Sequence, residues 1–346
     1  MNIGVMLPNW IGDAVMATPA LRSLRGLAGP SGRLAVFGKP HICDALRGLG
    51  WVDAVVDCQP KKEPREAARL IREQSLDQIV IMPNSLRSAW IAFRAGVPER
   101  VGSARPLRTP LLTTVFRQAT RRGRRLQLPT LDHYQQLAYA AGGDYVPPEL
   151  ELATTEADRA AADDAWNDLG LPSGERVVVL NSGGAFGASK RWPDEHFATL
   201  ARRLHDKLGF AVLVNCGPAE QELARNVVKL ARRPSVVSLA GRDLPVGLAK
   251  AVIERSRLLV STDSGPRFFG IAFRKPVVTL FGPTSPRHSD THYADETTLS
   301  LSLDCQPCWA SSCPLGHHKC MEDLSVERVF GAVKHRLTED TRREAA

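Results

Sequence analysis

A chain of 346 residues is longer than one typical hydrophobic core requires, so its length predicts two domains. Hydrophobic residues make up 43% of it and charged residues 24%, which is the profile of an ordinary globular protein and excludes a disordered one. No apolar run reaches the roughly 18 residues of a membrane-spanning helix, and the first residues lack the basic start and apolar core of a signal peptide. We therefore expect a cytoplasmic protein without a transmembrane segment.

In the first half of the chain, short β-rich runs alternate with segments of helical periodicity. The predicted strands cover residues 3–8, 33–38, 52–57 and 77–83, and the predicted helices cover residues 14–27, 42–49, 65–73, 86–95 and 131–143. Strands that alternate with helices in this way indicate a parallel sheet with right-handed crossovers.

Residues 144–158 contain two prolines and no clear period, so we place the linker between two domains there. The second half then repeats the pattern, with predicted strands at 175–181, 210–216, 235–241, 257–262 and 275–281 and predicted helices at 158–169, 193–209, 219–232 and 245–255. The sequence thus predicts an α/β fold of two doubly wound, Rossmann-like domains, residues 1–153 and 154–346, that face a central cleft.

The net charge of +8 is concentrated in one segment. Eight arginines and no acidic residue lie within it: Arg100, Arg105, Arg108, Arg117, Arg121, Arg122, Arg124 and Arg125. Such a segment suits an anionic partner, either nucleic acid, an acidic lipid surface or a phosphorylated glycan, or else it is a solvated surface loop. No nucleic-acid-binding motif accompanies it, so we do not expect a nucleic-acid partner.

Four of the seven cysteines lie in the segment 305–320, at Cys305, Cys308, Cys313 and Cys320. Three interpretations are open: a structural zinc site, disulfides, or reduced thiols that pack a loop. A cytoplasmic location disfavours disulfides, and the spacing differs from the paired C-x-x-C pattern of many zinc sites.

Polar and glycine residues follow the strands of the second half, where open parallel sheets bind their ligands. In "STDSGPRFFGIAF", Asp263 or Ser264 is predicted to cap a helix, Gly265 allows the tight turn, and Arg267 adds positive charge. The free N–H groups of such a helix start form an anion site, and the alternative is a well-capped helix that binds nothing.

The loop "NSGGAFGASKRW" is the second candidate for contact with a phosphate group. It contains Ser182 and Gly183 and delivers Lys190 close to the next helix, where an ammonium group can neutralise a diphosphate. It matches neither the phosphate-loop pattern nor the dinucleotide-binding glycine pattern. Thr284, after the last strand, lies on the same expected rim.

In the first domain, "NWIGDAV" places Asp13 just after the first strand. Asp13 is either the N-cap of the helix that follows or a carboxylate directed into a cleft. A carboxylate opposite a diphosphate site suits group transfer, because it can take a proton from an attacking hydroxyl while positive charge stabilises the leaving group.

Three stretches resemble the lipopolysaccharide heptosyltransferases of glycosyltransferase family 9: "GVMLPNWIGDAVMATPALRSLR", "NSGGAFGASKRWPDEHFATLARRL" and "STDSGPRFFGIAFRKPVVTLFGPTSP". The first of them is most similar to the heptosyltransferase II group. The resemblance covers nearly the whole chain. It implies a GT-B fold and inverting transfer of L-glycero-D-manno-heptose from ADP-heptose, without a metal or other cofactor, to the lipopolysaccharide inner core at the cytoplasmic face of the inner membrane.

By the same resemblance, Asp13 matches the family's catalytic base and Lys190 its phosphate-binding lysine. Asp263, Ser264 and Gly265 match its nucleotide loop, and Glu220 or Glu222 matches an acid that holds the ribose hydroxyls. The resemblance thus assigns residues 1–153 to the acceptor and residues 154–346 to the ADP-sugar.

The chain departs from the family pattern at Phe268, where a histidine is usual. An apolar ring cannot hydrogen-bond to a phosphate, so either Arg267 replaces it, or nucleotide affinity falls, or the substrate differs. Two alternatives to heptose transfer therefore stay open: a GT-B transferase for another nucleotide sugar, and a non-catalytic protein that binds a nucleotide sugar or glycan.

Overall fold

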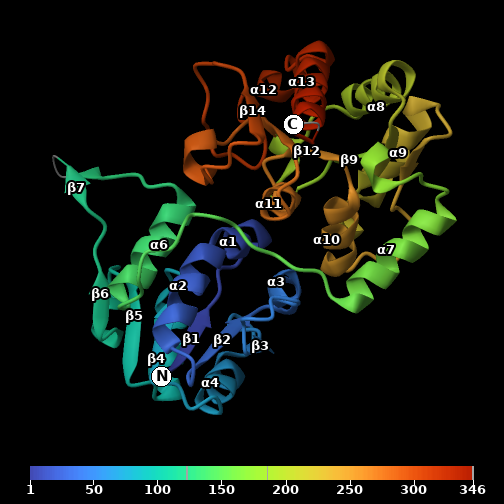
Figure 1. Ribbon diagram of the computed structural model, residues 1–346. Helices are drawn as coiled ribbons and strands as arrows, with labels where there is room; N and C mark the ends of the chain where they lie inside the picture. The colour runs from blue at the N-terminus through green and yellow to red at the C-terminus, as the bar shows by residue number, and fades with distance from the viewer. Residues whose placement is uncertain (122–123, 185, 345–346) are drawn as a thin grey trace. The chain divides into compact units, whose positions relative to one another are not determined.

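The computed structural model describes residues 1–121, 124–184 and 186–344, which divide into two compact units. The first unit comprises Met1–Ala153 and His288–His292, and the second comprises Thr154–Arg287 and Tyr293–Ala346 (Figure 1). The main division falls between residues 153 and 154, and the short segment 288–292 departs from the simple two-part division expected from the sequence.

The first unit contains a six-stranded sheet in which every pair of neighbouring strands is parallel. Its strands, in sheet order, are β3 (Ala54–Asp57), β2 (Arg33–Gly38), β1 (Asn2–Met6), β4 (Gln78–Ile81), β5 (Glu99–Ser103) and β6 (Thr114–Phe116). A short antiparallel pair, β7 (Thr120–Arg121) and β8 (Arg124–Arg125), follows β6.

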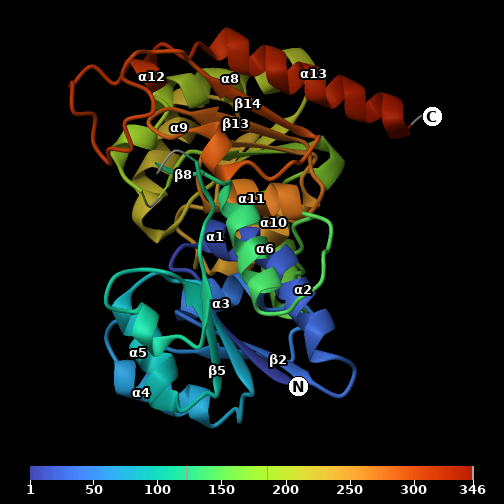
Figure 2. The same ribbon diagram turned by 90° about the vertical axis from the view of Figure 1, so that its left-hand side faces the viewer.

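Helices cover both faces of this sheet, since a parallel sheet is buried on both sides. Helices α4 and α5 lie on one face, and α1, α2, α3 and α6 on the other, each over its own cluster of buried apolar side chains (Figure 2). Their bounds are α1 (Ile11–Met16), α2 (Thr18–Ala28), α3 (Pro40–Leu46), α4 (Pro64–Arg72), α5 (Leu86–Ala95) and α6 (Thr130–Ala140).

The single helix predicted over residues 14–27 is wrong in one respect, because the structure divides it at Ala17 into α1 and α2. The physical cause is Pro19, which lacks an N–H and whose ring would clash with the carbonyl of Val15 in a continuous helix. The hydroxyl of Thr18 instead donates to the Val15 carbonyl at 2.7 Å.

The second unit repeats the same plan. All five neighbouring pairs in its six-stranded sheet are parallel. In sheet order the strands are β11 (Val236–Ser238), β10 (Ala211–Asn215), β9 (Val177–Asn181), β12 (Leu258–Thr262), β13 (Val277–Phe281) and β14 (Glu296–Ser300). The central strands β9 and β12 are fully buried, as their apolar runs predict.

The helices of the second unit pack in two groups. One group contains α8, α9 and α13, and the other contains α7, α10 and α11. The bounds are α7 (Glu156–Asp168), α8 (Asp194–Leu208), α9 (Gln221–Ala231), α10 (Val246–Arg255), α11 (Gly265–Ala272), α12 (Lys319–Glu322) and α13 (Val326–Glu344).

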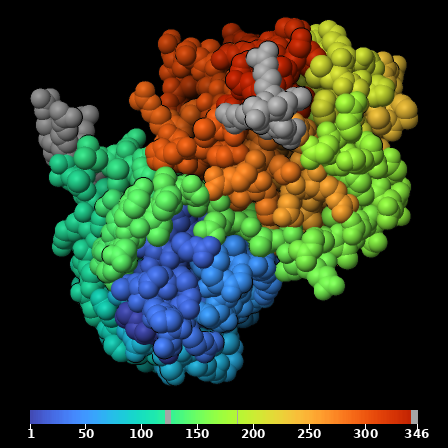
Figure 3. Space-filling model, in the orientation of Figure 1, coloured from blue at the N-terminus to red at the C-terminus, as the bar shows by residue number. Residues whose placement is uncertain are grey.

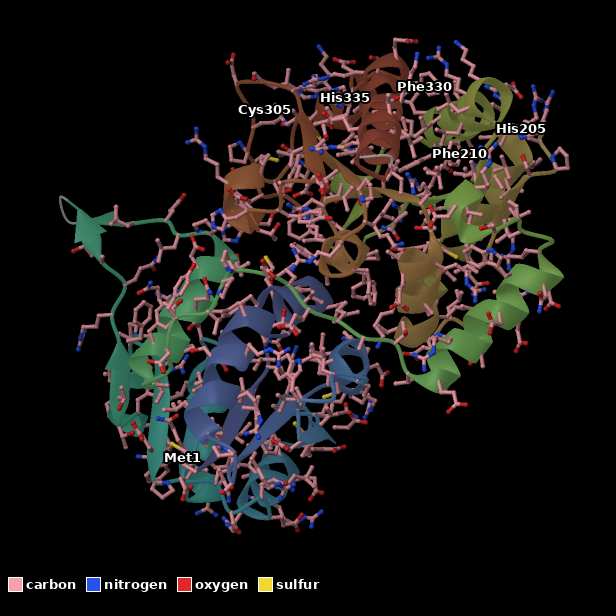
Figure 4. The ribbon with its side chains drawn as sticks, in the orientation of Figure 1. Met1, His205, Phe210, Cys305, Phe330 and His335 are labelled. Atoms are coloured by element: carbon pink, nitrogen blue, oxygen red, sulfur yellow. The ribbon has the colours of Figure 1, made fainter. Side chains whose placement is uncertain are left out.

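Helix α13 lies beside α8 on the surface of the second unit (Figure 3). Its Phe330 ring anchors this contact, with the Cζ of Arg203 and the Nζ of Lys207 lying 5.8 and 5.7 Å from the ring centroid (Figure 4). None of the helices described is long and apolar enough to cross a membrane.

Both sheets reverse their strand order at one point, between β1 and β4 in the first unit and between β9 and β12 in the second. In open α/β sheets, ligands bind outside the carboxyl ends of the strands at such a reversal, because the connections diverge there and leave a crevice. The loops after β1, β9 and β12 are therefore the places to look for a site.

The second unit's core supplies a test of the packing. Trp192 is 1% exposed, and its Nε1 donates to the carbonyl of Leu324 at 2.8 Å. We expect Trp192→Ala to lower the free energy of unfolding by about 3–5 kcal/mol, because it leaves a cavity and an unpaired carbonyl. Denaturant titration followed by circular dichroism measures this, with Trp309→Ala at a 46% exposed position as the control. Equal effects of the two substitutions would contradict the packing described.

Candidate functional site

In the second unit, the loops after β9, β10 and β12 are held together by side chains at their strand ends. Asn181 Nδ2 donates to the Gly183 carbonyl at 3.2 Å and to the Ser264 hydroxyl at 3.0 Å. Its Oδ1 accepts from Asn215 at 2.8 Å, and the Thr262 hydroxyl donates to the Gly183 carbonyl at 3.0 Å. These bonds fix the backbone at the reversal of strand order.

Asp263 is the centre of an ionic network at the end of β12. The Nζ of Lys190 donates to the Asp263 carbonyl oxygen at 2.6 Å and to its carboxylate at 2.7 Å. The Thr284 hydroxyl donates to the same carboxylate at 2.7 Å, and Arg267 lies 3.3 Å away. Burial by itself raises the pKa of Asp263, but the charges of Lys190 and Arg267 outweigh it and hold that pKa below the usual value. The carboxylate is therefore ionised and fixes Lys190 beside the start of α11.

Arg267 lies in the interior and not at the ligand-accessible edge. Its side chain is fully buried, and its Nε and Nη2 donate to the carboxylate of Glu296 at 2.6 and 2.9 Å. The rings of Phe268 and Phe281 lie 4.8 and 5.0 Å from its Cζ. The expectation that Arg267 offers positive charge to a ligand is therefore wrong for this structure, because a buried bidentate ion pair occupies the guanidinium.

The start of α11 differs from the expected capped helix. Ser264 occupies the N-cap position, but its side chain makes no capping hydrogen bond to the first turn. The Ser264 hydroxyl instead accepts from Asn181. Phe268, at the position of the family's histidine, is 4% exposed and packs in the interior.

Glu220 lies next to the loop after β9. Its carboxylate accepts from the Gly217 N–H at 2.8 Å. A Cβ atom built on Gly183 would lie only 2.0 Å from the Glu220 carboxyl carbon, so a side chain at position 183 would displace the Glu220 carboxylate. Of the two acids singled out in the sequence, Glu220 is thus at the edge of the site, whereas the side chain of Glu222 is 95% exposed.

Ser182 is 3% exposed, and among the residues described its hydroxyl has no hydrogen-bond partner. A buried hydroxyl without a partner is rare and costs free energy. Ser182 thus joins Gly183, Lys190, Glu220, Asp263, Ser264, Gly265 and Thr284 at this end of the sheet.

In the first unit, Asp13 lies just after β1, at that unit's reversal of strand order. It is the third residue of α1, which begins at Ile11, so the interpretation of Asp13 as an N-cap is wrong. The side chain is half-buried. Helix α1, which carries Asp13, packs against α6. Burial, and then the charge of Asp13, raise the pKa of Tyr134 on α6.

The arginine segment is divided by the structure. Arg100 donates to the carbonyl of Leu111 at 2.8 Å, and Arg108 is fully buried. Arg105 and Arg117 line a cavity. Arg122 lies outside the residues described, and the side chains of Arg121, Arg124 and Arg125 are likewise not described.

The seven cysteines are free thiols, so the disulfide interpretation is wrong. Over residues 1–121, 124–184 and 186–344, no group of three or more His, Cys, Asp or Glu side chains is arranged to hold a metal ion. The Sγ of Cys313 accepts from the His318 N–H at 3.4 Å, an arrangement that lowers the pKa of this thiol.

Two Rossmann-like units, each with polar side chains at its reversal of strand order, define the GT-B class of fold. The chain belongs to glycosyltransferase family 9 (heptosyltransferase), whose family model matches residues 65–319.

Relatives of known name align with this chain over nearly its whole length. Lipopolysaccharide heptosyltransferase 2 of Escherichia coli (strain K12) is 27% identical over 350 residues, covering 95% of this chain and 97% of that protein. Lipooligosaccharide heptosyltransferase 2 of Campylobacter jejuni (serotype O:2) is 33% identical over 345 residues, covering 97% and 98%. The solved structure of E. coli ADP-heptose LPS heptosyltransferase II has a TM-score of 0.81 at 24% identity, covering 99% and 100% of the two chains.

The Asp263 network generates a test of stability. We expect Asp263→Ala to lower the free energy of unfolding by about 3–5 kcal/mol, because it removes the buried carboxylate that pairs with both Lys190 and Arg267. Since the folded pKa of Asp263 is lowered, its contribution is complete above the unfolded pKa of about 3.9 and is lost as the pH falls through the folded pKa. The difference in the free energy of unfolding between variant and wild type is therefore largest at neutral pH and decreases in acid.

Denaturant titration between pH 3 and pH 7 measures it. The control is Asp206→Ala, which removes an exposed ion pair with Arg233 and should leave stability almost unchanged. A difference that grows in acid, or an equal effect of both variants, would contradict the assignment.

Proposed function

We propose that this protein transfers L-glycero-D-manno-heptose from ADP-heptose to the inner core of lipopolysaccharide. The names of its relatives support the activity and both substrates. The observation that carries the proposal is the position of Lys190, which Asp263 fixes beside the start of α11 at the strand reversal of the second unit.

Lys190 and α11 suit the diphosphate of the donor. The N-cap residue of α11, Ser264, makes no side-chain cap to the first turn, and a helix N-terminus of this kind suits a phosphate oxygen. An ammonium beside it neutralises the negative charge that develops on ADP as the bond to the sugar breaks. The ion pair with Asp263 holds Lys190 in place and does not consume all three of its N–H donors.

Asp13 acts as the general base in this proposal. It takes the proton of the acceptor hydroxyl while the hydroxyl oxygen attacks the anomeric carbon of the heptose, and the bond to the ADP oxygen breaks. Attack on the side opposite to ADP inverts the anomeric configuration. The position of Asp13 at the first unit's strand reversal supports this role, and the mechanism uses no metal or other cofactor.

Glu220, Ser182 and Gly183 complete the donor site in this proposal. Glu220 accepts from the ribose hydroxyls, and the lack of a side chain at Gly183 lets the nucleotide approach the backbone. The free hydroxyl of Ser182 offers a further hydrogen bond. We expect the reaction to take place in the cytoplasm, at the surface of the inner membrane where the acceptor lies.

Phe268 favours a second candidate, transfer from another nucleotide sugar. The ring is buried and cannot replace a histidine that contacts phosphate. Arg267 is also buried, where it pairs with Glu296 and does not reach the edge of the sheet. A screen of nucleotides for thermal stabilisation separates the two donors. We expect ADP-heptose and ADP to raise the melting temperature and UDP and GDP to leave it unchanged; stabilisation by UDP or GDP alone would overturn the choice of donor.

The catalytic role of Asp13 separates an enzyme from a non-catalytic binding protein. We expect Asp13→Asn to lower turnover by roughly 100- to 10,000-fold, because the general base is lost, and to leave ADP affinity unchanged. Turnover is measured with ADP-heptose and a truncated core acceptor, and affinity by calorimetry. Glu66→Gln, at an exposed position of α4, is the control. Full turnover in Asp13→Asn would exclude the proposed role.

A further inference from the structure

A cavity of about 290 Å³ lies in the first unit, at the carboxyl ends of β5 and β6 and beside α6. Its lining includes Ser103 at the end of β5, Phe116 at the end of β6 and His133 of α6. Its volume is at the lower end of the range for small-molecule pockets, roughly 300–1,000 Å³, so it suits one sugar ring and not an oligosaccharide.

The lining of the cavity contains both aromatic and cationic side chains. The rings of Phe116 and His133 lie 5.6 Å apart, and the Ser103 hydroxyl is 3.3 Å from His133 Nε2. Arg105 and Arg117 also line the cavity. No carboxylate within the described part of the chain forms an ion pair with either guanidinium. Aromatic rings pack against the apolar face of a sugar, and guanidinium groups bind carboxylate or phosphate oxygens.

A buried positive charge lies close to the lining of the cavity. Arg108 is fully buried against Gly102, the neighbour of Ser103, and its Nη1 donates to the Pro83 carbonyl at 2.7 Å. Its Nε and Nη2 have no hydrogen-bond partner among the residues described. Burial lowers the pKa of Arg108 to about 10, so the group stays charged at neutral pH. An uncompensated charge here favours a negatively charged ligand in the cavity.

The cavity lies near the candidate base. His133 and Tyr134 are neighbours on α6 with ring centroids 5.9 Å apart. Burial, and then the charge of Asp13, raise the pKa of Tyr134. Both Asp13 and the cavity are at the carboxyl edge of the same sheet. A sugar in the cavity would thus occupy the same edge of the sheet as the proposed base.

We propose that the cavity lined by Ser103, Arg105, Phe116, Arg117 and His133 binds an anionic sugar unit of the acceptor, held through a carboxylate or a phosphate. This inference rests on the proposed transfer to a lipopolysaccharide core and adds to it the residues that recognise the acceptor. Arg105 and Arg117 bind the anionic group, and Phe116 packs against the ring.

The test compares Arg105→Gln and Arg117→Gln with Arg87→Gln, which removes one positive charge at an exposed position of α5 outside the cavity. The acceptor is deacylated inner-core oligosaccharide in three forms: native, with its carboxylates reduced to alcohols, and dephosphorylated. We expect the cavity variants to raise the acceptor KM about 10- to 100-fold with the native form, without change in donor KM, and Arg87→Gln to leave both unchanged.

The increase in acceptor KM caused by the cavity variants should disappear with one of the two neutralised acceptors. That acceptor identifies whether a carboxylate or a phosphate occupies the cavity. The inference would be overturned if Arg105→Gln and Arg117→Gln had the same acceptor KM as Arg87→Gln. It would also be overturned if their acceptor KM stayed raised with both neutralised forms.

Acceptor binding without donor, measured by calorimetry, separates this inference from the proposed function. Weakened binding by the cavity variants supports the cavity even if no sugar is transferred. Unchanged binding together with intact heptose transfer would overturn the cavity assignment and leave the transferase assignment standing. Phe116→Leu, which keeps an apolar side chain but removes the ring, should weaken the binding of all three forms equally; unchanged binding would remove the role of the ring.

Discussion

The carboxylate of Asp263 binds Lys190 and Thr284 and pairs with the buried Arg267, so it connects the loops after β9, β12 and β13. Two cationic side chains thus contact one buried carboxylate. A second carboxylate, that of Glu296 on β14, also forms an ion pair with Arg267. Such a network is stable only when each charge has its partner. The position of Lys190 at the edge of the sheet is therefore a consequence of ion pairs that extend into the core.

The two units share one strand order, and in each the candidate residues follow the strands where that order reverses. In the second unit these are the loops of Ser182, Lys190 and Asp263, and in the first it is the turn that holds Asp13. Parallel connectivity explains why residues so distant in the chain belong to the same kind of position. The aromatic and cationic cavity beside α6 extends the list of polar groups at the first unit's edge.

Buried parallel strands are the easiest elements to predict, and β1, β9 and β12 lie where their apolar runs indicate. Three strands of the two large sheets, β5, β6 and β14, escaped prediction. The edge strands β6 and β14 are partly exposed and lack a continuous apolar run, and β5 carries Glu99, Arg100 and a glycine. Asp13, Lys190 and Asp263 were identified from loop position and family motif. The burial of Arg267 was not predictable, because its partner Glu296 lies 29 residues away on an unpredicted strand.

In the proposed reaction Lys190, held by Asp263, binds the diphosphate of the nucleotide. Calorimetric titration of ADP and of adenosine into the wild type and Lys190→Met tests it most directly. We expect the wild type to bind ADP more tightly than adenosine, and we expect the variant to lose most of this difference while it keeps its affinity for adenosine. Equal ADP affinity in both proteins would contradict it.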